Sequence, residues 1–357
     1  MRGELKNAKR IVVKLGTAVL TDDRKQPDRA QMRQLVAQIA RQRREGRELV
    51  IVTSGAVGAG MGVLGYAKRP ESVAEQQACA AVGQSRLMAT YEKLFAEFDL
   101  HVAQVLLTHA DLQHHERHHN ARGTLLTLLK KDVVPIINEN DAVSTTELKF
   151  GDNDRLSALV AALLPADLLV ILTSVDGVMR DFGKQTAKRL SAISEIDSDI
   201  EALAGGTTSA TAVGGMESKI QAAKIVVRSG VPLVIAPGRN TTVLDDIVRG
   251  RDVGTLFLPK QTKMRGRKRW IAFFHHPKGS VFVDAGARRA LIENGKSLLQ
   301  PGVTRCEGEF EPGEIVSICD DEGQEFARGM IAFGSEEICQ RKIARGELVH
   351  RDDLVIL

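Results

Sequence analysis

The sequence has 357 residues, 43% of them hydrophobic, which is enough for two domains with at least one large buried core. Its 49 basic and 45 acidic residues leave a formal net charge of +4, which gives no global argument for nucleic-acid or membrane binding. The longest apolar stretch, about Leu156 to Leu164, is too short to span a bilayer, and no signal peptide is visible, so we expect a cytoplasmic protein.

Up to residue 258, short β-branched runs alternate with longer amphipathic segments. Strands are predicted at Arg10–Leu15, Leu49–Thr53, Val102–Leu107, Val133–Ile137, Leu168–Leu172 and Val231–Ala236, and helices at Asp28–Glu45, Ala74–Phe98, His114–Lys130, Asn153–Leu164 and Glu217–Ser229. Most strands are continuously apolar, as expected of strands covered on both faces. The alternation predicts a mostly parallel sheet between layers of helices.

Two short clusters place small or basic residues at strand ends. Lys14 and Gly16 lie at the end of the first strand, and Thr53–Ala56 follows the second. Ligands of parallel α/β sheets bind beyond these strand ends, where a lysine and backbone amides favour phosphate. Taken alone, Lys14 also fits a strand-end lysine that extends to solvent, and glycine-rich turns are common in α/β folds. Neither cluster matches GxxxxGK[ST] or GxGxxG, which excludes a P-loop and a dinucleotide fingerprint.

Short polar side chains form two further clusters, Asn138–Asp141 after the fourth strand and Gly151–Asp154 before a helix. Turn chemistry and a helix N-cap would explain each cluster by itself. Together they are typical of a lining for the ammonium group of an amino acid, and Asp154 is suited to hold lysines by charge-assisted bonds.

Gly214–Lys219 precedes a predicted helix and places Lys219 in its first turn. Glycines and a lysine there suit a polyphosphate tail, although a loop with a surface lysine has the same composition. Two lysines, backbone amides and an acid are what phosphoryl transfer needs without a P-loop, because the transferring group spreads negative charge over its oxygens.

The run His114–His119 contains histidine pairs four residues apart on one predicted helix. No cysteine or carboxylate is spaced as a third ligand, and the flanks are charged. We therefore interpret this run as a solvated helix face, and metal ligands stay unknown.

The composition changes near residue 259. A basic linker, 259–270, leads into short alternating runs with frequent turn signals, which predict a small, mostly β domain over residues 271–357. The preceding domain would then span residues 1–258. The cysteines show no paired spacing, which predicts reduced thiols at Cys79, Cys306, Cys319 and Cys339.

In chain order, these motifs resemble those of the amino acid kinase family. The resemblance rests on Val12–Gly16, Val52–Val57, Asn138–Asp141, Phe150–Asp154 and Gly214–Met216. It extends essentially end to end, because Gly279–Leu291 is similar to the start of the PUA domain carried by the glutamate-phosphorylating branch. It implies a three-layer α/β sandwich with a mostly parallel sheet, followed by a small, mostly β PUA-like domain.

The resemblance also implies a reaction. The γ-phosphoryl group of ATP would be transferred to the side-chain carboxylate of L-glutamate, giving glutamyl 5-phosphate in the first step of proline biosynthesis. It implies Mg²⁺ as cofactor, proline as a feedback inhibitor, and a homodimer or homotetramer. The acceptor carboxylate is already anionic, so no general base is needed, and catalysis would consist of positioning and charge compensation.

Roles carried over to matching positions fall into three groups. Lys14, Lys219 and Asp154 would be catalytic, with Asp154 holding both lysines. Glutamate would be bound by Ser54, Gly55, Asn138, Asp141 and Asn153. The nucleotide would be bound by Lys14, Gly16, Thr173, Ser174, Val213, Gly214, Gly215, Met216, Glu217, Ser218 and Lys219.

Two departures from the family pattern affect the nucleotide site. Val213 and Glu217 stand where the family often has hydroxyl residues, and Ser174 stands where an aspartate is frequent. Two other functions stay open at this point. In the first, the chain is another amino acid kinase, which acts on aspartate, acetylglutamate, carbamate or a nucleoside monophosphate. In the second, it is an RNA-binding protein that uses its PUA-like domain.

Overall fold

The computed structural model describes residues 2–22, 27–143, 153–204, 215–259, 268, 271–272, 277–340, 343 and 346–357. The chain divides into two compact units, Met1–Lys263 and Met264–Leu357. Each has a hydrophobic core of its own. No helix in the described residues is long and apolar enough to cross a membrane.

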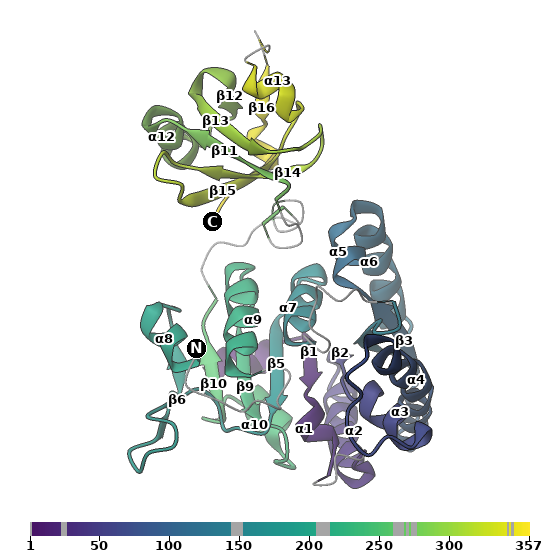
Figure 1. Cartoon of the computed structure of the whole chain (residues 1–357). Helices are drawn as coiled ribbons and strands as arrows, with labels where there is room; N and C mark the ends of the chain where they lie inside the picture. The colour runs from purple at the N-terminus through teal and green to yellow at the C-terminus, as the bar shows by residue number, and fades with distance from the viewer. Residues whose placement is uncertain are drawn as a thin grey trace. The chain divides into compact units, whose positions relative to one another are not determined.

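The first unit is built on an eight-stranded sheet with the order β3-β4-β2-β1-β5-β9-β10-β8 (Figure 1). Its strands are β1 Arg10–Leu15, β2 Glu48–Val52, β3 Val102–Leu107, β4 Val134–Glu139, β5 Leu168–Thr173, β8 Ala192–Ile193, β9 Leu233–Pro237 and β10 Thr255–Phe257. The six long strands run parallel. The predicted mostly parallel sheet is therefore confirmed, and the short β10 is antiparallel to β9.

Helices cover both faces of this sheet. They are α1 Thr17–Leu20, α2 Arg29–Arg44, α3 Ala56–Leu64, α4 Val73–Ala96, α5 His109–Gln113, α6 His115–Lys130, α7 Asn153–Leu163, α8 Ser198–Ala204, α9 Met216–Arg228 and α10 Val243–Val248. Alternate residues of the strands, such as Val13 and Ile51, join Leu35 and Ile39 of α2 in one core cluster. Helices α7 and α9 pack side by side against β1, β5 and β9. This packing brings the start of α7 and the start of α9 together.

Some elements differ from the sequence expectation. Strand β4 continues to Glu139, so Asn138 and Glu139 are its last two residues rather than part of the following loop. The sequence pattern did not predict α5, α8, α10, β8 and β10, nor the two-residue strands β6 Met179–Arg180 and β7 Lys188–Arg189. Elements this short contain too few residues to show a helical or strand periodicity.

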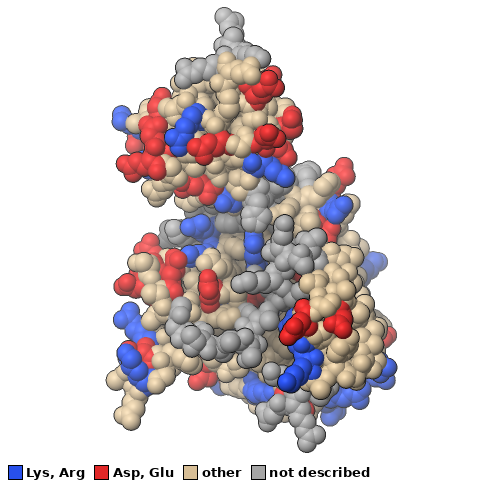
Figure 2. All heavy atoms as spheres, in the orientation of Figure 1, with Lys and Arg blue, Asp and Glu red and all other residues tan. Residues whose placement is uncertain are grey.

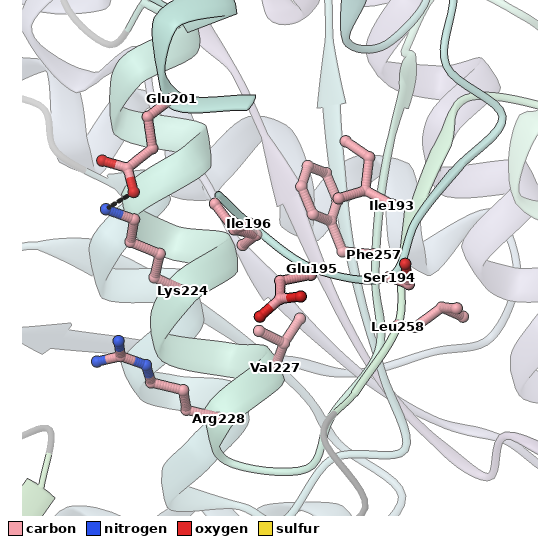
Figure 3. Close-up of a pocket in the computed structure, with 10 residues that line it drawn as sticks. All are labelled: Ile193, Ser194, Glu195, Ile196, Glu201, Lys224, Val227, Arg228, Phe257 and Leu258. Carbon is pink, nitrogen blue, oxygen red and sulfur yellow. Dashed lines mark ion pairs between the residues drawn. The ribbon is translucent and has the colours of Figure 1, made fainter. Parts of the chain in front are cut away.

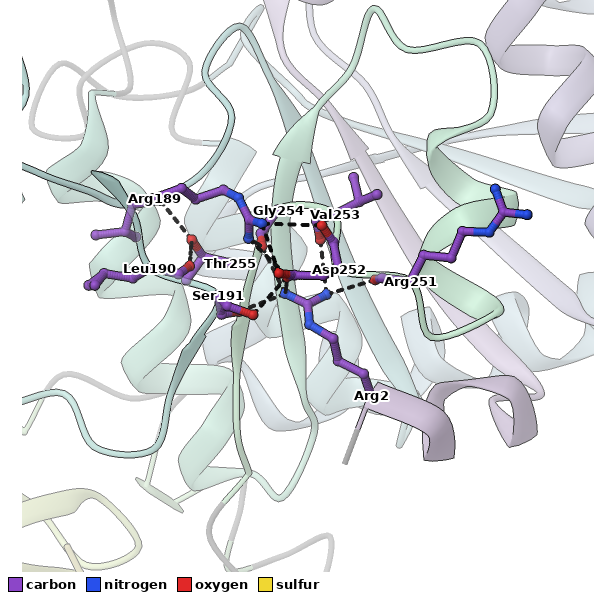
Figure 4. A network of polar contacts seen from close by, with 10 residues as sticks. Arg2, Arg189, Leu190, Ser191, Arg251, Asp252, Val253, Gly254 and Thr255 are labelled. Atoms are coloured by element: carbon purple, nitrogen blue, oxygen red, sulfur yellow. Dashed lines mark hydrogen bonds and ion pairs between the residues drawn. The ribbon is translucent and has the colours of Figure 1, made fainter. Parts of the chain in front are cut away.

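The N-terminal 3-10 helix, Arg2–Asn7, is tied to the loop before β10 by one guanidinium group (Figure 4). Arg2 donates to the carbonyl oxygens of Ser191, Val253 and Gly254 at 2.6, 3.0 and 2.8 Å, and it pairs with Asp252 at 3.0 Å. The carbonyl oxygen of Ser191 also accepts from the N–H of Leu256 in β10, so Arg2 adds a side-chain bond to a segment that the sheet already holds.

The second unit contains a five-stranded sheet with the order β13-β11-β14-β15-β17, in which only β11 and β14 run parallel. Its elements are β11 Gly279–Val283, α12 Ala285–Asn294, β12 Leu298–Leu299, η2 Gln300–Gly302, β13 Val303–Gly308, β14 Ile315–Cys319, β15 Glu325–Met330, α13 Ser335–Cys339, β16 Glu347–Val349, η3 Arg351–Asp353 and β17 Leu354–Ile356. The small, mostly β domain predicted from the turn signals is confirmed.

One expectation about this unit was wrong. Cys306 on β13 and Cys339 at the end of α13 form a disulfide, whereas we expected four reduced thiols. The two residues are 33 positions apart in sequence, and only the packing of α13 against β13 brings their Cα atoms to 6.0 Å. Cys79 and Cys319 are buried thiols.

Candidate active site

Two lysines and one carboxylate from three separate elements meet at the carboxyl ends of the parallel strands. Lys14 Nζ of β1 lies 2.7 Å from Asp154 Oδ1, and Lys219 Nζ of α9 lies 3.0 Å from Asp154 Oδ2. Asp154 is in the first turn of α7. In the sequence, Lys14 precedes this aspartate by 140 residues and Lys219 follows it by 65. The packing of α7 against β1 and α9 brings the three residues together.

All three side chains are buried, with exposed fractions of 6% for Lys14, 1% for Asp154 and 5% for Lys219. Burial alone would raise the pKa of Asp154, but the charges of Lys14 and Lys219 outweigh it and lower that pKa to about 2. With Asp154 ionised, the two ammonium groups leave the cluster with one net positive charge. A buried excess of positive charge favours an anionic ligand at this position.

Ser218 reinforces the cluster from the first turn of α9. Its hydroxyl donates to Asp154 Oδ2 at 2.6 Å, and it lies 2.9 Å from the carbonyl oxygen of Gly215. The Ser218 side chain thus contacts the carboxylate that orients the lysines, and its predicted contact to the nucleotide stays a prediction.

Backbone geometry leaves little room beside Lys14. A Cβ atom on Gly16 would lie 3.3 Å from the carbonyl oxygen of Leu172 and 3.6 Å from Lys14 Nζ. Gly55 is the N-cap of α3 with φ of +102°, a conformation that a residue with a side chain adopts only with strain. The close backbone approach to a ligand predicted for Gly16 stays a prediction, and the positive φ of Gly55 explains why a glycine stands at that turn.

A network of amide side chains continues from the lysine cluster. Asn153, next to Asp154, donates through Nδ2 to Ser54 Oγ at 3.0 Å and to Asn138 Oδ1 at 3.1 Å. All three residues are buried. The structure therefore brings together three of the residues predicted to bind glutamate, from β4, α7 and the turn after β2.

Acidic groups lie at the end of this network. Asp141 follows β4, and Glu139 ends that strand. Burial, reinforced by the negative charge of Glu139, raises the pKa of Asp141 to about 6, while the charge of Arg69 opposes the shift. Asp141 Oδ1 and Glu139 Oε1 are buried and have no hydrogen-bond partner in the part of the chain that the structure describes. Such acceptors suit an ammonium group.

The remaining predicted nucleotide residues lie around the same edge of the sheet. Thr173 is the last residue of β5 and is half-buried, and Ser174 is exposed. Gly215 caps α9, which begins with Met216 and the exposed Glu217. Val213 and Gly214 lie outside the described residues, so their predicted contacts stay predictions.

Sequence reasoning missed three buried polar residues beside the network. Gln84 of α4 accepts a hydrogen bond from Asn138 Nδ2 at 2.9 Å, and His109 Nδ1 lies 3.8 Å from Glu139 Oε2. Tyr91 of α4 shares a 2.7 Å hydrogen bond with Thr53. Gln84 and Tyr91 occupy positions on α4 where periodicity predicts only a buried face, and His109 begins the short α5, which shows no periodicity. In each case the sequence pattern does not identify the polar partner.

One pocket lies away from this site (Figure 3). Phe257, one of its lining residues, pairs with Leu233, the first residue of β9, whereas the lysine cluster lies beyond the last residues of the parallel strands. At its rim Lys224 pairs with Glu201 at 2.8 Å. The pocket therefore lies near the amino-terminal ends of the parallel strands, and the lysine cluster lies at their carboxyl ends.

No group of three or more histidine, cysteine, aspartate or glutamate residues arranged to hold a metal ion occurs among the described residues. In the histidine run, His114 and His119 are exposed, and His118 Nδ1 lies 3.2 Å from the carbonyl oxygen of Leu112.

Comparison with known proteins agrees with this geometry. Residues 9–237 match the amino acid kinase family, and residues 279–351 match the PUA domain. Among solved structures, the carbamate kinase from Giardia lamblia bound to AMP-PNP covers 71% of this chain and 100% of its own, with a TM-score of 0.52. Its identity is 18%, so this similarity concerns the fold.

Relatives of similar length are closer in sequence. The glutamate 5-kinase of Moorella thermoacetica is 45% identical over 368 residues, which cover 99% of this chain and 97% of the relative. The glutamate 5-kinase of Citrifermentans bemidjiense is 45% identical over 373 residues, which cover 100% of both chains. The motifs predicted from the sequence, the lysine–aspartate cluster and these full-length similarities agree, and the chain belongs to the amino acid kinase family, in its glutamate 5-kinase branch.

Proposed function

We propose that this chain transfers the γ-phosphoryl group of ATP to the side-chain carboxylate of L-glutamate. The product is glutamyl 5-phosphate, and the reaction is the first step of proline biosynthesis. The single observation that carries the proposal is the buried Lys14–Asp154–Lys219 cluster beside the Ser54–Asn153–Asn138 network. Full-length relatives named glutamate 5-kinase support the choice of substrate.

The lysine cluster accounts for charge compensation. As the phosphoryl group moves between two oxygens, its negative charge spreads over three equatorial oxygens. Lys14 and Lys219 would contact these oxygens, and Asp154 would hold both ammonium groups in place throughout transfer. The bond from the γ-phosphorus to the β,γ-bridging oxygen breaks, and a bond from the glutamate carboxylate oxygen forms, with ADP as the leaving group.

The amide network accounts for the acceptor. Ser54, Asn138 and Asn153 would bind and orient glutamate, and Asp141 would attract its ammonium group. The acceptor carboxylate is ionised at neutral pH, so no side chain has to remove a proton. The rate enhancement would come from orientation and from fixed charges in a site that excludes water.

ATP is the co-substrate, and we propose that Mg²⁺ enters with it. When bound, this ion would neutralise phosphate charge. Oxygens of ATP and water would supply most of its ligands, because the described residues offer no cluster of carboxylates for it. Thr173, Ser174 and residues 213–219 would bind the nucleotide.

The remaining family properties are also proposals for this chain. We infer feedback inhibition by proline, assembly as a homodimer or homotetramer, and activity in the cytoplasm, where ATP and glutamate are available.

RNA binding through the second unit is not favoured. Acidic residues outnumber basic ones between residues 279 and 357, and Figure 2 shows acidic side chains gathered over this unit. Binding to a nucleic-acid backbone depends on an excess of lysine and arginine. The other amino acid kinase substrates are not favoured either, since the full-length relatives are glutamate 5-kinases.

The direct test is ADP release by the full chain with a panel of acceptors. Glutamate should support ATP turnover, and aspartate, acetylglutamate, carbamate and nucleoside monophosphates should not. Faster turnover with aspartate than with glutamate would contradict the proposed substrate. Addition of proline to the same assay tests feedback inhibition.

A further inference from the structure

A buried glutamine at the end of the amide network has one hydrogen-bonding group without a protein partner. Gln84 of α4 has an exposed fraction of 8%. Its Oε1 accepts from Asn138 Nδ2 at 2.9 Å, whereas its Nε2 is buried and has no hydrogen-bond partner among the residues that the structure describes. A buried donor without a partner is costly, so such a group usually has a partner in the functional state.

The backbone fixes the orientation of this amide. The N–H of Glu139 can only donate, and it lies 3.0 Å from Asn138 Oδ1, so this atom must be the oxygen of the Asn138 amide. Asn138 Nδ2 is then the donor to Gln84, which makes Oε1 the acceptor and directs Nε2 away from Asn138. The assignment therefore follows from a main-chain contact and does not depend on a free choice of amide flip.

Three other unpartnered atoms around the network are acceptors, and a fourth, His109 Nε2, is a ring nitrogen that donates or accepts according to its tautomer. Asn153 Oδ1, Glu139 Oε1 and Asp141 Oδ1 are buried acceptors without a partner in the described residues. A ligand that satisfies these three atoms and Gln84 must offer both donors and an acceptor. A free α-amino acid does so with its ammonium and carboxylate groups.

The order of the side chains gives the ligand a direction. Asp154 and its lysines are followed by Asn153, then by Asn138 and then by Gln84, each joined to the next by sequence or by a hydrogen bond. The γ-carboxylate of glutamate must face the lysine cluster to receive the phosphoryl group. Its α-carbon would therefore lie toward Gln84.

We propose that Gln84 Nε2 donates a hydrogen bond to the α-carboxylate of glutamate and so selects acceptors that carry this group. The inference rests on the proposed function and adds a substrate-binding residue to it. Gly83 fixes the position of this donor, because a Cβ atom there would lie 1.8 Å from the carbonyl oxygen of Ala56, next to the Ser54–Gly55 turn.

The test is Gln84→Glu in the full chain, assayed with glutamate and with its α-amide, which keeps the γ-carboxylate. Glutamate at position 84 still accepts from Asn138 Nδ2, but it replaces the outward donor by an acceptor. We expect kcat/KM for glutamate to fall by roughly 10- to 100-fold, as for the loss of a charge-assisted hydrogen bond. The α-amide, which can donate to the new carboxylate, should lose much less or gain.

Gln76→Glu is the matched control, because it adds the same charge to α4 two turns earlier, where Gln76 bonds Arg69 and Pro70. The ratio of kcat/KM for the two substrates should stay as in the wild type. Gln84→Met, which removes the donor without adding a charge, should bring that ratio closer to one.

Two outcomes would overturn the proposal. The first is an equal loss of kcat/KM for glutamate and for its α-amide in Gln84→Glu, as expected of a purely structural glutamine. The second is an unchanged KM for glutamate in that variant. Failure of the wild-type chain to use glutamate would instead contradict the proposed function itself, so the two failures are distinguishable.

Discussion

Asp154 pairs with two lysines and leaves one net positive charge in a buried site. Removing either lysine leaves a neutral pair in place of a cationic cluster. The residue that remains cannot compensate the charge that develops on the transferring phosphoryl group.

We predict that Lys14→Ala and Lys219→Ala each lower kcat by about 10²–10³-fold or more, which is typical of losing one electrostatic contact to a transition state. Circular dichroism should report a folded protein in both cases. Lys184→Ala, which removes an exposed lysine paired with Asp181, is the control and should keep wild-type turnover. Wild-type kcat in either site variant would disprove the catalytic assignment.

Asp141 gives the site a dependence on pH. Its pKa of about 6 in the folded protein is above the value of an unfolded aspartate, so this carboxyl is protonated at pH 5 and ionised at pH 7. Stability from this group is greatest at low pH and falls as the pH rises through about 6. The attraction of Asp141 for the ammonium group of the substrate increases over the same pH range, because the carboxyl becomes negatively charged.

We therefore predict that the KM for glutamate falls as the pH is raised from 5 to 7, with little change in the KM for ATP. Asp141→Asn should give a high KM for glutamate at every pH in this range. Asp154, with a pKa of about 2, contributes no titration there. A pH profile that persists in Asp141→Asn would assign the titration to another group.

At the level of elements, two glycines allow α3 and α4 to touch. A Cβ atom on Gly60 would lie 1.8 Å from the carbonyl oxygen of Cys79, and one on Gly83 would lie equally close to that of Ala56. The contact holds Gln84 beside the Ser54–Gly55 turn, so helix packing and substrate binding are coupled here.

Gly83→Ala should push α3 and α4 apart, with a loss of unfolding free energy of about 1–3 kcal/mol, as for overpacking in a core. The KM for glutamate should rise as well. Gly123→Ala in α6 is the control: nothing lies within 4 Å of its added Cβ, so helix propensity should stabilise it by up to about 1 kcal/mol. Denaturant titration would measure both, and equal effects would refute the packing argument.

At the level of the whole molecule, two units with separate cores are joined in one chain. Only the second contains a disulfide, Cys306–Cys339, which closes a loop with a sequence separation of 33 residues. Closing a loop of this length stabilises a fold by about 3–4 kcal/mol in the chain-entropy description.

A reducing agent should therefore lower the unfolding midpoint of the second unit and leave that of the first unchanged. Calorimetry would show two transitions, and Gly83→Ala, which acts on the first unit, would identify which is which. The double variant Cys306→Ser, Cys339→Ser should be insensitive to the reductant. A reductant effect on both transitions would mean that the units unfold together.

Much of the fold follows from local sequence. Continuous apolar runs predicted the six long parallel strands, because most positions of strands covered on both faces are apolar. The predicted helix ends also lie close to the observed ones. For example, Asp28 is the N-cap of α2, and its side chain accepts a hydrogen bond from the N–H of Gln31. The short strands β6, β7 and β8 had no such signal, and the disulfide depended on α13 packing against β13.

The sequence by itself determined that Lys14, Asp154, Lys219 and the asparagine clusters would lie at one edge of a parallel sheet, because that edge is where strands of this kind end. Only the tertiary structure decided that one carboxylate holds both lysines and that the pKa of Asp141 is raised to about 6. It also decided which way Gln84 directs its donor. The physical reason is that burial, hydrogen-bond direction and Coulomb interaction depend on distances between residues far apart in the chain, and a sequence pattern contains spacing along the chain but not those distances.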